Sequence, residues 1–191
     1  MSGKLDLLIG PMYATKSVTL MNRLIIASEL GLKVLYINHA FDVRSSHVFS
    51  THHPFMTLKA QDNIEFVSLS SLRGTRREEF DVIGIDEAQF FDKSLIDFVK
   101  VHVEVYRRHV IVAGLDGDSK REKFGYILDL IPLCDTVTKL RPYCQECGPK
   151  KTKALFSHKY HSSEGTESTA VDVGGKEKYK PLCRECYLKF T

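Results

Sequence analysis

Residues 5–31 read LDLLIGPMYATKSVTLMNRLIIASELG and hold, in order, an apolar run, a turn and an amphipathic segment. The run from Leu5 to Ile9 predicts a buried strand, and the apolar residues between Leu20 and Leu30 recur at helical spacing. Gly31 supplies a signal for the end of that helix. A strand that leads through a tight turn into a helix is the repeating unit of α/β folds, so this class is expected.

The turn between the predicted strand and helix, GPMYATKS, has the position and much of the composition of a phosphate-binding loop. Backbone N–H groups at the start of a helix, helped by the helix dipole, can hold phosphate oxygens. Lys16 would then reach the β- and γ-phosphates, and Ser17 would ligate Mg²⁺ through its hydroxyl. The strict pattern has glycine where Thr15 stands, and an ordinary strand-to-helix turn with a surface lysine is the alternative. The candidate residues are Gly10, Pro11, Met12, Tyr13, Ala14, Thr15, Lys16 and Ser17.

Strand-like and helix-like segments continue to alternate as far as residue 141. Further strands are expected at Val34–Ile37, Ile64–Leu69, Val82–Ile85, Val110–Ala113 and Thr136–Leu140, and helices at Asp92–Arg107, with Asp92 as N-cap, and at Gly125–Leu133. The apolar periodicity fades near Pro142, where cysteines and lysines become frequent. A boundary there divides the chain into a body, residues 1–141, and an appendage, residues 142–191.

The strand expected at 82–85 ends in two carboxylates, Asp86 and Glu87. In a second nucleotide-binding motif, Asp86 would hold Mg²⁺ and Glu87 would accept a proton from the attacking hydroxyl or water. A solvated strand end is the alternative for this pair on its own. Asp42 and Arg44, just past an earlier strand, could add a metal-shell carboxylate and a cation for phosphate charge, although a surface pair is the simpler interpretation.

Four cysteines form two C-x-x-C pairs, Cys144 with Cys147 and Cys183 with Cys186. Two such pairs together can close a tetrahedral shell, so the pattern predicts a structural Zn²⁺ site. A redox pair or an iron–sulfur cluster is the rival interpretation. The residues between the pairs, 148–182, read as a long polar loop in which glycines at 174–175 would let the backbone approach a ligand.

Composition narrows the function classes. The 191 residues are 43% hydrophobic, which is enough for a globular core, and 27 basic against 24 acidic residues give a net charge of +3. So mild a charge favours neither a nucleic-acid nor a membrane partner, and no apolar run approaches the length of a membrane span. With five cysteines and no sign of an export signal, reduced thiols or metal ligands and a cytoplasmic location are expected.

Taken together, the motifs resemble those of the class II thymidine kinases, the zinc-containing cytosolic and viral type. The resemblance rests on GPMY-x-x-KS, on Asp-x-Arg at 42–44, on DEAQFF at 86–91, on VIVAGLDG at 110–117, on FG at 124–125, on the cysteine pairs and on VGGKEKY at 173–179. It implies a P-loop NTPase-like, RecA-like sheet, mostly parallel with helices on both faces, and a small zinc-ribbon-like domain that carries a lasso loop. It also implies transfer of the ATP γ-phosphate to the 5′-hydroxyl of thymidine or deoxyuridine, and a homotetramer.

The resemblance also assigns roles to residues. Glu87 would stand in the place of the catalytic base, with Asp86 and Gln89 in the second nucleotide motif. The wall around the base and the lasso contacts would be Met12, Leu115, Ser119, Phe124, Ala170, Val171, Asp172, Val173, Gly174 and Tyr179. The chain departs from the family pattern at Thr15, Val18, Ser119 and Asp172.

Two other functions remain open at this point. One is a catalytically impaired relative with the same fold that acts as a binding or regulatory subunit, which the departures at Thr15, Ser119 and Asp172 would favour. The other is a zinc-ribbon nucleic-acid module, suggested by the lysines at 150–153 and the histidines between 158 and 161. The near-neutral charge and the absence of interleaved aromatic and basic residues argue against it.

Overall fold

Six parallel strands form the central sheet of this computed structural model, which describes residues 2–41, 63–75, 77–148, 152–160 and 178–190. The strands lie in the order β3-β2-β4-β5-β1-β6, and each pair in that order runs parallel. Their bounds are β1 Lys4–Ile9, β2 Val34–His39, β3 Ile64–Leu69, β4 Val82–Ile85, β5 His109–Gly114 and β6 Thr136–Lys139. The expected mostly parallel α/β sheet is therefore confirmed.

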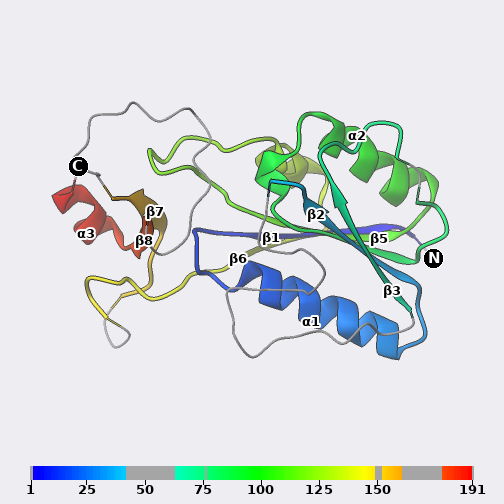
Figure 1. Ribbon diagram of the computed structural model, residues 1–191, viewed down its shortest axis with the longest axis horizontal. Coiled ribbons are helices and arrows are strands. Elements are labelled where there is room, and N and C mark those ends of the chain that lie inside the picture. Colours follow the sequence, from blue (N-terminus) through cyan, green and yellow to red (C-terminus); the bar gives the residue numbers. More distant parts are fainter. Residues whose placement is uncertain (1, 42–62, 76, 149–151, 161–177, 191) are drawn as a thin grey trace.

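Helices cover both faces of this sheet, as Figure 1 shows. Helix α1, Lys16–Glu29, packs on one face, and α2, Ser94–Lys100, lies on the other. The two faces have separate cores: Leu8 of β1 packs with Leu20 and Leu24 of α1, whereas Leu7 packs with Phe98 of α2. Because the sheet is covered on both sides, its strands read as nearly continuous apolar runs, which is why the sequence identified them.

The segment after Asp92 is helical as expected, but it changes type. The N-cap of α2 is Lys93 and not Asp92 as predicted, although the Asp92 carboxylate accepts a hydrogen bond from the Ser94 backbone N–H (2.9 Å) at the start of the helix. The helix then continues as a π-helical turn, Val101–Val105, in which hydrogen bonds join residues five positions apart. The helix expected at Gly125–Leu133 is a 3₁₀ helix, Ile127–Leu133, with Pro132 inside it.

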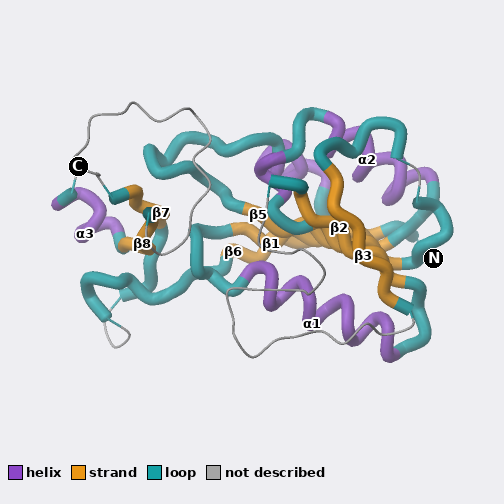
Figure 2. Tube along the Cα trace, viewed as in Figure 1, coloured by secondary structure: helices purple, strands orange, loops and turns teal. Residues whose placement is uncertain are grey.

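The residues beyond 141 form a small unit with its own sheet. Strand β7, Phe156–Lys159, pairs antiparallel with β8, Tyr179–Leu182, and helix α3, Arg184–Lys189, follows. Figure 2 shows these short elements outside the central sheet, next to the carboxyl end of β1. The prediction that 148–182 is loop throughout is wrong at both strands. Each is only four residues long and β8 contains Pro181, a residue that ordinarily argues against a strand.

None of the helices within the described ranges is long and apolar enough to cross a lipid bilayer.

Candidate active site and cysteine cluster

The parallel sheet brings the predicted motifs to one edge. The GPMYATKS turn follows β1, Asp86 follows β4, and Leu115 follows β5. Since the carboxyl ends of parallel strands meet at the same edge, residues that are far apart in sequence become neighbours there. This edge is therefore the candidate site.

The loop at residues 10–15 has an unusual backbone path. Gly10 has φ 145°, and a Cβ there would lie 2.2 Å from the Leu140 carbonyl oxygen, so this position requires glycine. Tyr13 (φ 64°) and Thr15 (φ 59°) also lie in the left-handed region, which residues with side chains seldom adopt. Such strain persists only where the surroundings impose it, and it is common at ligand-binding loops.

Thr15 occupies the conformation for which glycine is the usual residue. Its hydroxyl donates to the neighbouring Ala14 carbonyl and does not cap the helix. We expect Thr15→Gly to raise the free energy of unfolding by about 1 kcal/mol, because the left-handed strain of a β-branched residue exceeds the entropic cost of glycine. Urea titration measures this, and Thr15→Ala, which keeps the Cβ, is the matched control. Equal stability of the two variants would contradict the strain argument.

Lys16 lies at the head of α1 among three carboxylates. Its ammonium group donates to the Pro11 carbonyl oxygen (2.8 Å), so the side chain folds back across the loop. Burial lowers the pKa of Lys16 below its ordinary value, although the negative charges of Glu87, Asp86 and Asp116 oppose this shift. The Lys16 ammonium group thus lies beside the loop, where it could neutralise the charge of a phosphate group bound there. Asp116, which also pairs with Lys139 (2.7 Å), was not singled out from the sequence.

The carboxylate of Asp86 is buried at the end of β4. Tyr36 donates its hydroxyl to it (2.8 Å), and the Ser17 side chain is a further hydrogen-bond partner. Burial, followed by the adjacent charge of Glu87, raises the pKa of Asp86 to about 6, although these hydrogen bonds lower it. The structure thus brings together Ser17 and Asp86, the two residues that were predicted to hold Mg²⁺. A hydroxyl and a carboxylate are the hard oxygen ligands that suit this ion, so the donors fit it.

Glu87 has an unusual backbone and a fixed side chain. Its φ of 49° and ψ of 39° are left-handed, so Glu87, the second residue after β4, has a strained backbone. Gln89 donates its amide N–H to the Glu87 carboxylate (2.6 Å), and its amide oxygen accepts from the Leu115 backbone N–H (2.9 Å). Gln89 is buried and uses both ends of its amide in these contacts. It therefore sets the orientation of Glu87.

The backbone of Gly125 lies directly against the backbone of Gln89. Its φ is 63°, and a Cβ at this position would lie 2.2 Å from the Gln89 carbonyl oxygen. Phe124, predicted for the base wall, contacts Phe90 edge-to-face with ring centroids 5.6 Å apart. The DEAQFF motif and the FG pair are thus packed against each other.

The other predicted pocket residues divide into two groups. Within the described chain, the Ser119 carbonyl oxygen accepts a hydrogen bond from the Tyr187 hydroxyl (2.6 Å). The Met12 backbone N–H donates to the Ser157 hydroxyl oxygen (2.9 Å). Tyr179, placed in the long loop by the sequence, is the first residue of β8, opposite Lys159. The following predicted residues lie outside the described ranges: Asp42, Arg44, Ala170, Val171, Asp172, Val173 and Gly174.

The four predicted metal ligands do converge. The sulfur atoms of Cys144, Cys147, Cys183 and Cys186 all lie within 4.8 Å of one another. Zinc–sulfur bonds of about 2.3 Å in a tetrahedron place sulfur atoms roughly 3.8 Å apart. The Cys147 sulfur lies 3.9 Å from that of Cys183 and 3.4 Å from that of Cys186, so the cluster fits Zn²⁺.

The thiol environment also suits a metal. Burial raises the pKa of the Cys144 thiol, but hydrogen bonds from the backbone of Cys183, Cys147 and Glu146 lower it more, to about 7. A thiolate is the form that binds metal, and Cys144 is the ligand that loses its proton near neutral pH, whereas the hydrogen bond with Cys147, followed by burial, raises the pKa of Cys186 in the metal-free cluster. All five cysteines, including Cys134 outside the cluster, are free of disulfide bonds.

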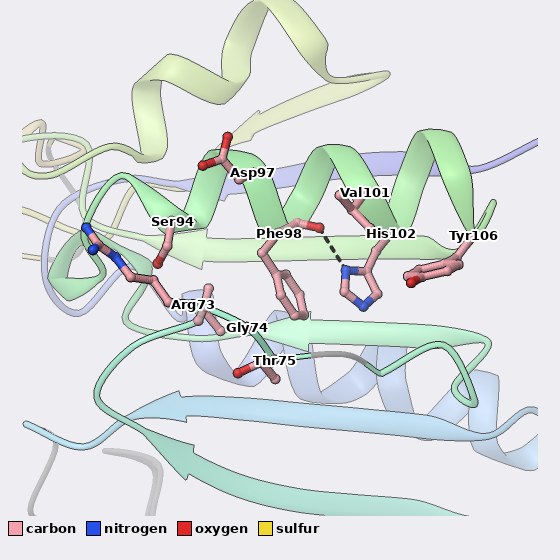
Figure 3. A pocket seen from close by; sticks show the side chains of 10 residues that line it. Arg73, Gly74, Thr75, Ser94, Asp97, Phe98, Val101, His102 and Tyr106 are labelled. Atoms are coloured by element: carbon pink, nitrogen blue, oxygen red, sulfur yellow. Dashed lines mark hydrogen bonds between the residues drawn. The ribbon is translucent and has the colours of Figure 1, made fainter.

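A cavity of about 370 Å³ lies away from this edge, between α2 with its π-helical turn and residues 72–75. Figure 3 shows Phe98, His102 and Tyr106 on the same side of the helix, with Phe98 pointing toward Gly74 and Thr75. The His102 ring stacks on Phe98 at 3.9 Å between centroids, and its Nδ1 bonds the Phe98 carbonyl oxygen at 2.8 Å. Since that nitrogen must donate, Nε2 of the neutral ring is an acceptor, and it is buried with no hydrogen-bond partner among the described residues.

His102 makes stability depend on pH. Burial lowers its pKa in the folded state below the ordinary 6.5, so below pH 6.5 the unfolded chain binds a proton that the folded chain refuses. As the pH falls below 6.5, protonation of His102 in the unfolded chain should therefore lower the free energy of unfolding by up to about 1.4 kcal/mol per pH unit. His102→Phe, which keeps a ring beside Phe98, should flatten the loss measured by urea titration from pH 7.5 to 5. If the free energy of unfolding falls with the same slope in His102→Phe and in the parent, His102 is not the cause, because other titrating groups such as His39 are common to both proteins.

Three residues at or behind the site were missed from the sequence: Tyr36, Asp116 and Ser157. Tyr36 sits in a buried strand and reads as a core residue, and Asp116 lies in a quoted motif without a role of its own. Ser157 lies in a segment that read as polar loop. In each case the signal is a tertiary contact, which a single sequence does not carry.

Comparisons with known proteins agree with the geometry. The family model for thymidine kinase matches residues 3–187. A rice thymidine kinase is 38% identical over 188 residues, which cover 97% of this chain and 66% of the relative. The human cytosolic thymidine kinase is 35% identical over 189 residues, with 98% and 74% covered. A myxoma virus thymidine kinase is 35% identical over 191 residues, with 97% of each chain covered.

The chain thus spans just under two thirds of the rice relative and almost the full length of the viral one. The family match takes in the GPMYATKS turn, the acidic end of β4 and all four cysteines. With that match and with relatives above 30% identity, the chain belongs to the thymidine kinase family.

Proposed function

We propose that this protein is an ATP-dependent thymidine kinase that transfers the γ-phosphate of ATP to the 5′-hydroxyl of thymidine or deoxyuridine. The observation that carries the proposal is the grouping of Lys16, Ser17, Asp86 and Glu87 at one edge of the sheet in a member of this family. A cation, a pair of oxygen ligands and a candidate base are the parts that phosphoryl transfer requires. The product would serve DNA precursor synthesis.

In this proposal the loop at residues 10–17 binds the ATP phosphates. Lys16 would leave the Pro11 carbonyl and bind phosphate oxygens, since both are acceptors for the same ammonium group. Ser17 and Asp86 would hold Mg²⁺, which neutralises phosphate charge when bound. Asp42 and Arg44 would add to this shell, as the family resemblance suggests.

Glu87 would take the proton of the 5′-hydroxyl. The Gln89 amide holds its carboxylate in place, so the base is oriented before the nucleoside arrives. Met12, Leu115, Ser119, Phe124 and Tyr179, together with residues 170–174, would surround the nucleoside. Closure of this wall would keep water away from the γ-phosphate and limit hydrolysis.

The cysteine cluster would hold a structural Zn²⁺. Its four thiols leave no open coordination position, so the ion would stabilise the residues beyond 141 and take no part in the reaction. We further propose two domains, residues 1–141 for nucleotide binding and 142–191 for zinc and the lasso, since the latter region has a buried cluster of its own. A cytoplasmic location follows the name of the human cytosolic relative, and a homotetramer is proposed from the resemblance alone.

The test is a turnover assay with labelled ATP, Mg²⁺ and each deoxynucleoside in turn, with the 5′-monophosphate as the product. We expect product with thymidine and deoxyuridine. If no monophosphate forms and thymidine does not shift the melting temperature, the protein is an impaired relative that serves as a binding or regulatory subunit. Salt-sensitive binding of single-stranded nucleic acid would instead support the nucleic-acid module.

A further inference from the structure

The phosphate loop is held from outside by one side chain of the cysteine-rich unit. The backbone N–H of Met12 donates to the hydroxyl oxygen of Ser157 at 2.9 Å, although 145 positions separate the two residues. Ser157 lies in β7 and is only 4% exposed, whereas Met12 is partly exposed, so water has limited access to this contact. The hydrogen bond joins the two parts of the chain at the candidate ATP site.

The loop needs such a contact because its backbone is strained. Gly10, Tyr13 and Thr15 all have positive φ within six residues, and the last two carry side chains. A conformation of this kind relaxes unless neighbouring groups hold it. The Lys16 contact to Pro11 lies within the loop segment itself and would be given up to phosphate. The Ser157 contact is independent of the ligand and can hold the loop in both states.

Ser157 is itself fixed by the strand that leads into the second cysteine pair. In the β7–β8 hairpin, Ser157 lies opposite Pro181 and Phe156 opposite Leu182, the residue before Cys183. The first cysteine pair holds the same strand, because the Gln145 N–H donates to the Pro181 carbonyl oxygen (3.0 Å). Strand β8 therefore lies between β7 and the first pair, and a shift of the cysteines moves Ser157.

We propose that Ser157 is a positioning residue that couples metal binding at the four-cysteine cluster to the affinity of the phosphate loop for Mg-ATP. The coupling rests on the proposed function. When the cluster holds its ion, both cysteine pairs are joined, β8 is fixed, and Ser157 stays under Met12. When the ion leaves, the hairpin loosens and the strained loop loses its support. Since coupling is reciprocal, bound Mg-ATP tightens the metal site by the same factor.

The first test compares hydroxyl and methyl at position 157. We expect Ser157→Ala to weaken Mg-ATP binding about tenfold by calorimetry, because the part-buried N–H of Met12 loses its acceptor and the strained loop loses a support. Ser157→Thr keeps the hydroxyl and should restore most of the affinity. Tyr187→Phe is the matched control: it removes another hydroxyl of the same unit, one that bonds Ser119 and not the phosphate loop. It should bind Mg-ATP like the parent.

The second test measures the coupling itself. The apparent affinity for Zn²⁺ is determined by competition with a chelator, with and without saturating Mg-ATP, at one ATP concentration for all proteins so that metal binding by ATP cancels. Mg-ATP should raise the zinc affinity about tenfold in the parent and less than twofold in Ser157→Ala. Equal coupling in the two proteins, or equal Mg-ATP affinity in the first test, overturns the proposal.

Failure of the Ser157 proposal can be distinguished from failure of the proposed kinase function. If the parent itself shows no heat with Mg-ATP, the proposed function fails. The positioning role of Ser157 is then decided by hydrogen exchange: protection of the Met12 amide should be lost in Ser157→Ala and kept in Ser157→Thr. Protection that is the same in all three proteins overturns the role of Ser157 whatever the ligand.

Discussion

Glu87→Gln is expected to lower kcat by a factor of about 10²–10⁴, the usual contribution of a general base, while the affinity for Mg-ATP stays within about twofold. An amide has no basic oxygen for the proton of the 5′-hydroxyl. The amide oxygen can still accept the hydrogen bond from Gln89, so the local geometry is retained. Rapid-quench turnover and calorimetry separate the two quantities.

The same substitution should also change the behaviour of Asp86. The charge of Glu87 is, after burial, the main cause that raises the pKa of Asp86 to about 6. Removing that charge lowers the pKa, so Asp86 stays ionised in more acidic solution. We expect Glu87→Gln to bind Mg-ATP better than the parent at pH 5.5, and equally well at pH 8, where Asp86 is ionised in both proteins.

Asp116→Asn is the matched control for the loss of kcat. It also removes one negative charge that acts on Lys16, but it leaves Glu87 and Gln89 unchanged. Its kcat should fall far less than that of Glu87→Gln. A similar fall in both variants would mean that Glu87 acts only through the charge balance around Lys16, and that it is not the base.

The central sheet could be predicted because its strands are buried on both faces. Apolar runs such as Val82–Ile85 and Val110–Ala113 leave little choice of structure, and the tight turn at Gly10 separates strand from helix clearly. The hairpin β7–β8 could not be predicted in the same way. Its strands are short and carry Lys159, Lys180 and Pro181, and it is held by the cysteine cluster more than by an apolar pattern.

The site was predictable as far as it consists of motifs. The sequence named Lys16, Ser17, Asp86 and Glu87, and the structure places them together. It also named Thr15 as a departure, but not that its backbone would keep the left-handed conformation that favours glycine. The Gln89 bridge and the Ser157 contact depend on side chains that meet only after folding, so no local pattern announces them.

Lys16→Met is expected to reduce the affinity for Mg-ATP by at least about 100-fold, because the ammonium group would make two or more charge-assisted hydrogen bonds to phosphate oxygens. The loss has a second cause. Without the nearby cation, Asp86 and Glu87 repel each other unopposed, and the pKa of Asp86 rises further above about 6. The carboxyl group would then be partly protonated at neutral pH and a poorer ligand for Mg²⁺.

Stability should move little in this variant. The methionine side chain has a similar length, and the folded protein no longer has to bury the Lys16 charge, so the free energy of unfolding is expected to stay within about 1 kcal/mol. Lys139→Met is the matched control: it removes another cation near the site, one that pairs with Asp116 and is about half exposed. Its Mg-ATP affinity should change less than threefold. If Lys16→Met binds Mg-ATP like the parent, the triphosphate does not sit in this loop, and the kinase assignment loses its physical basis.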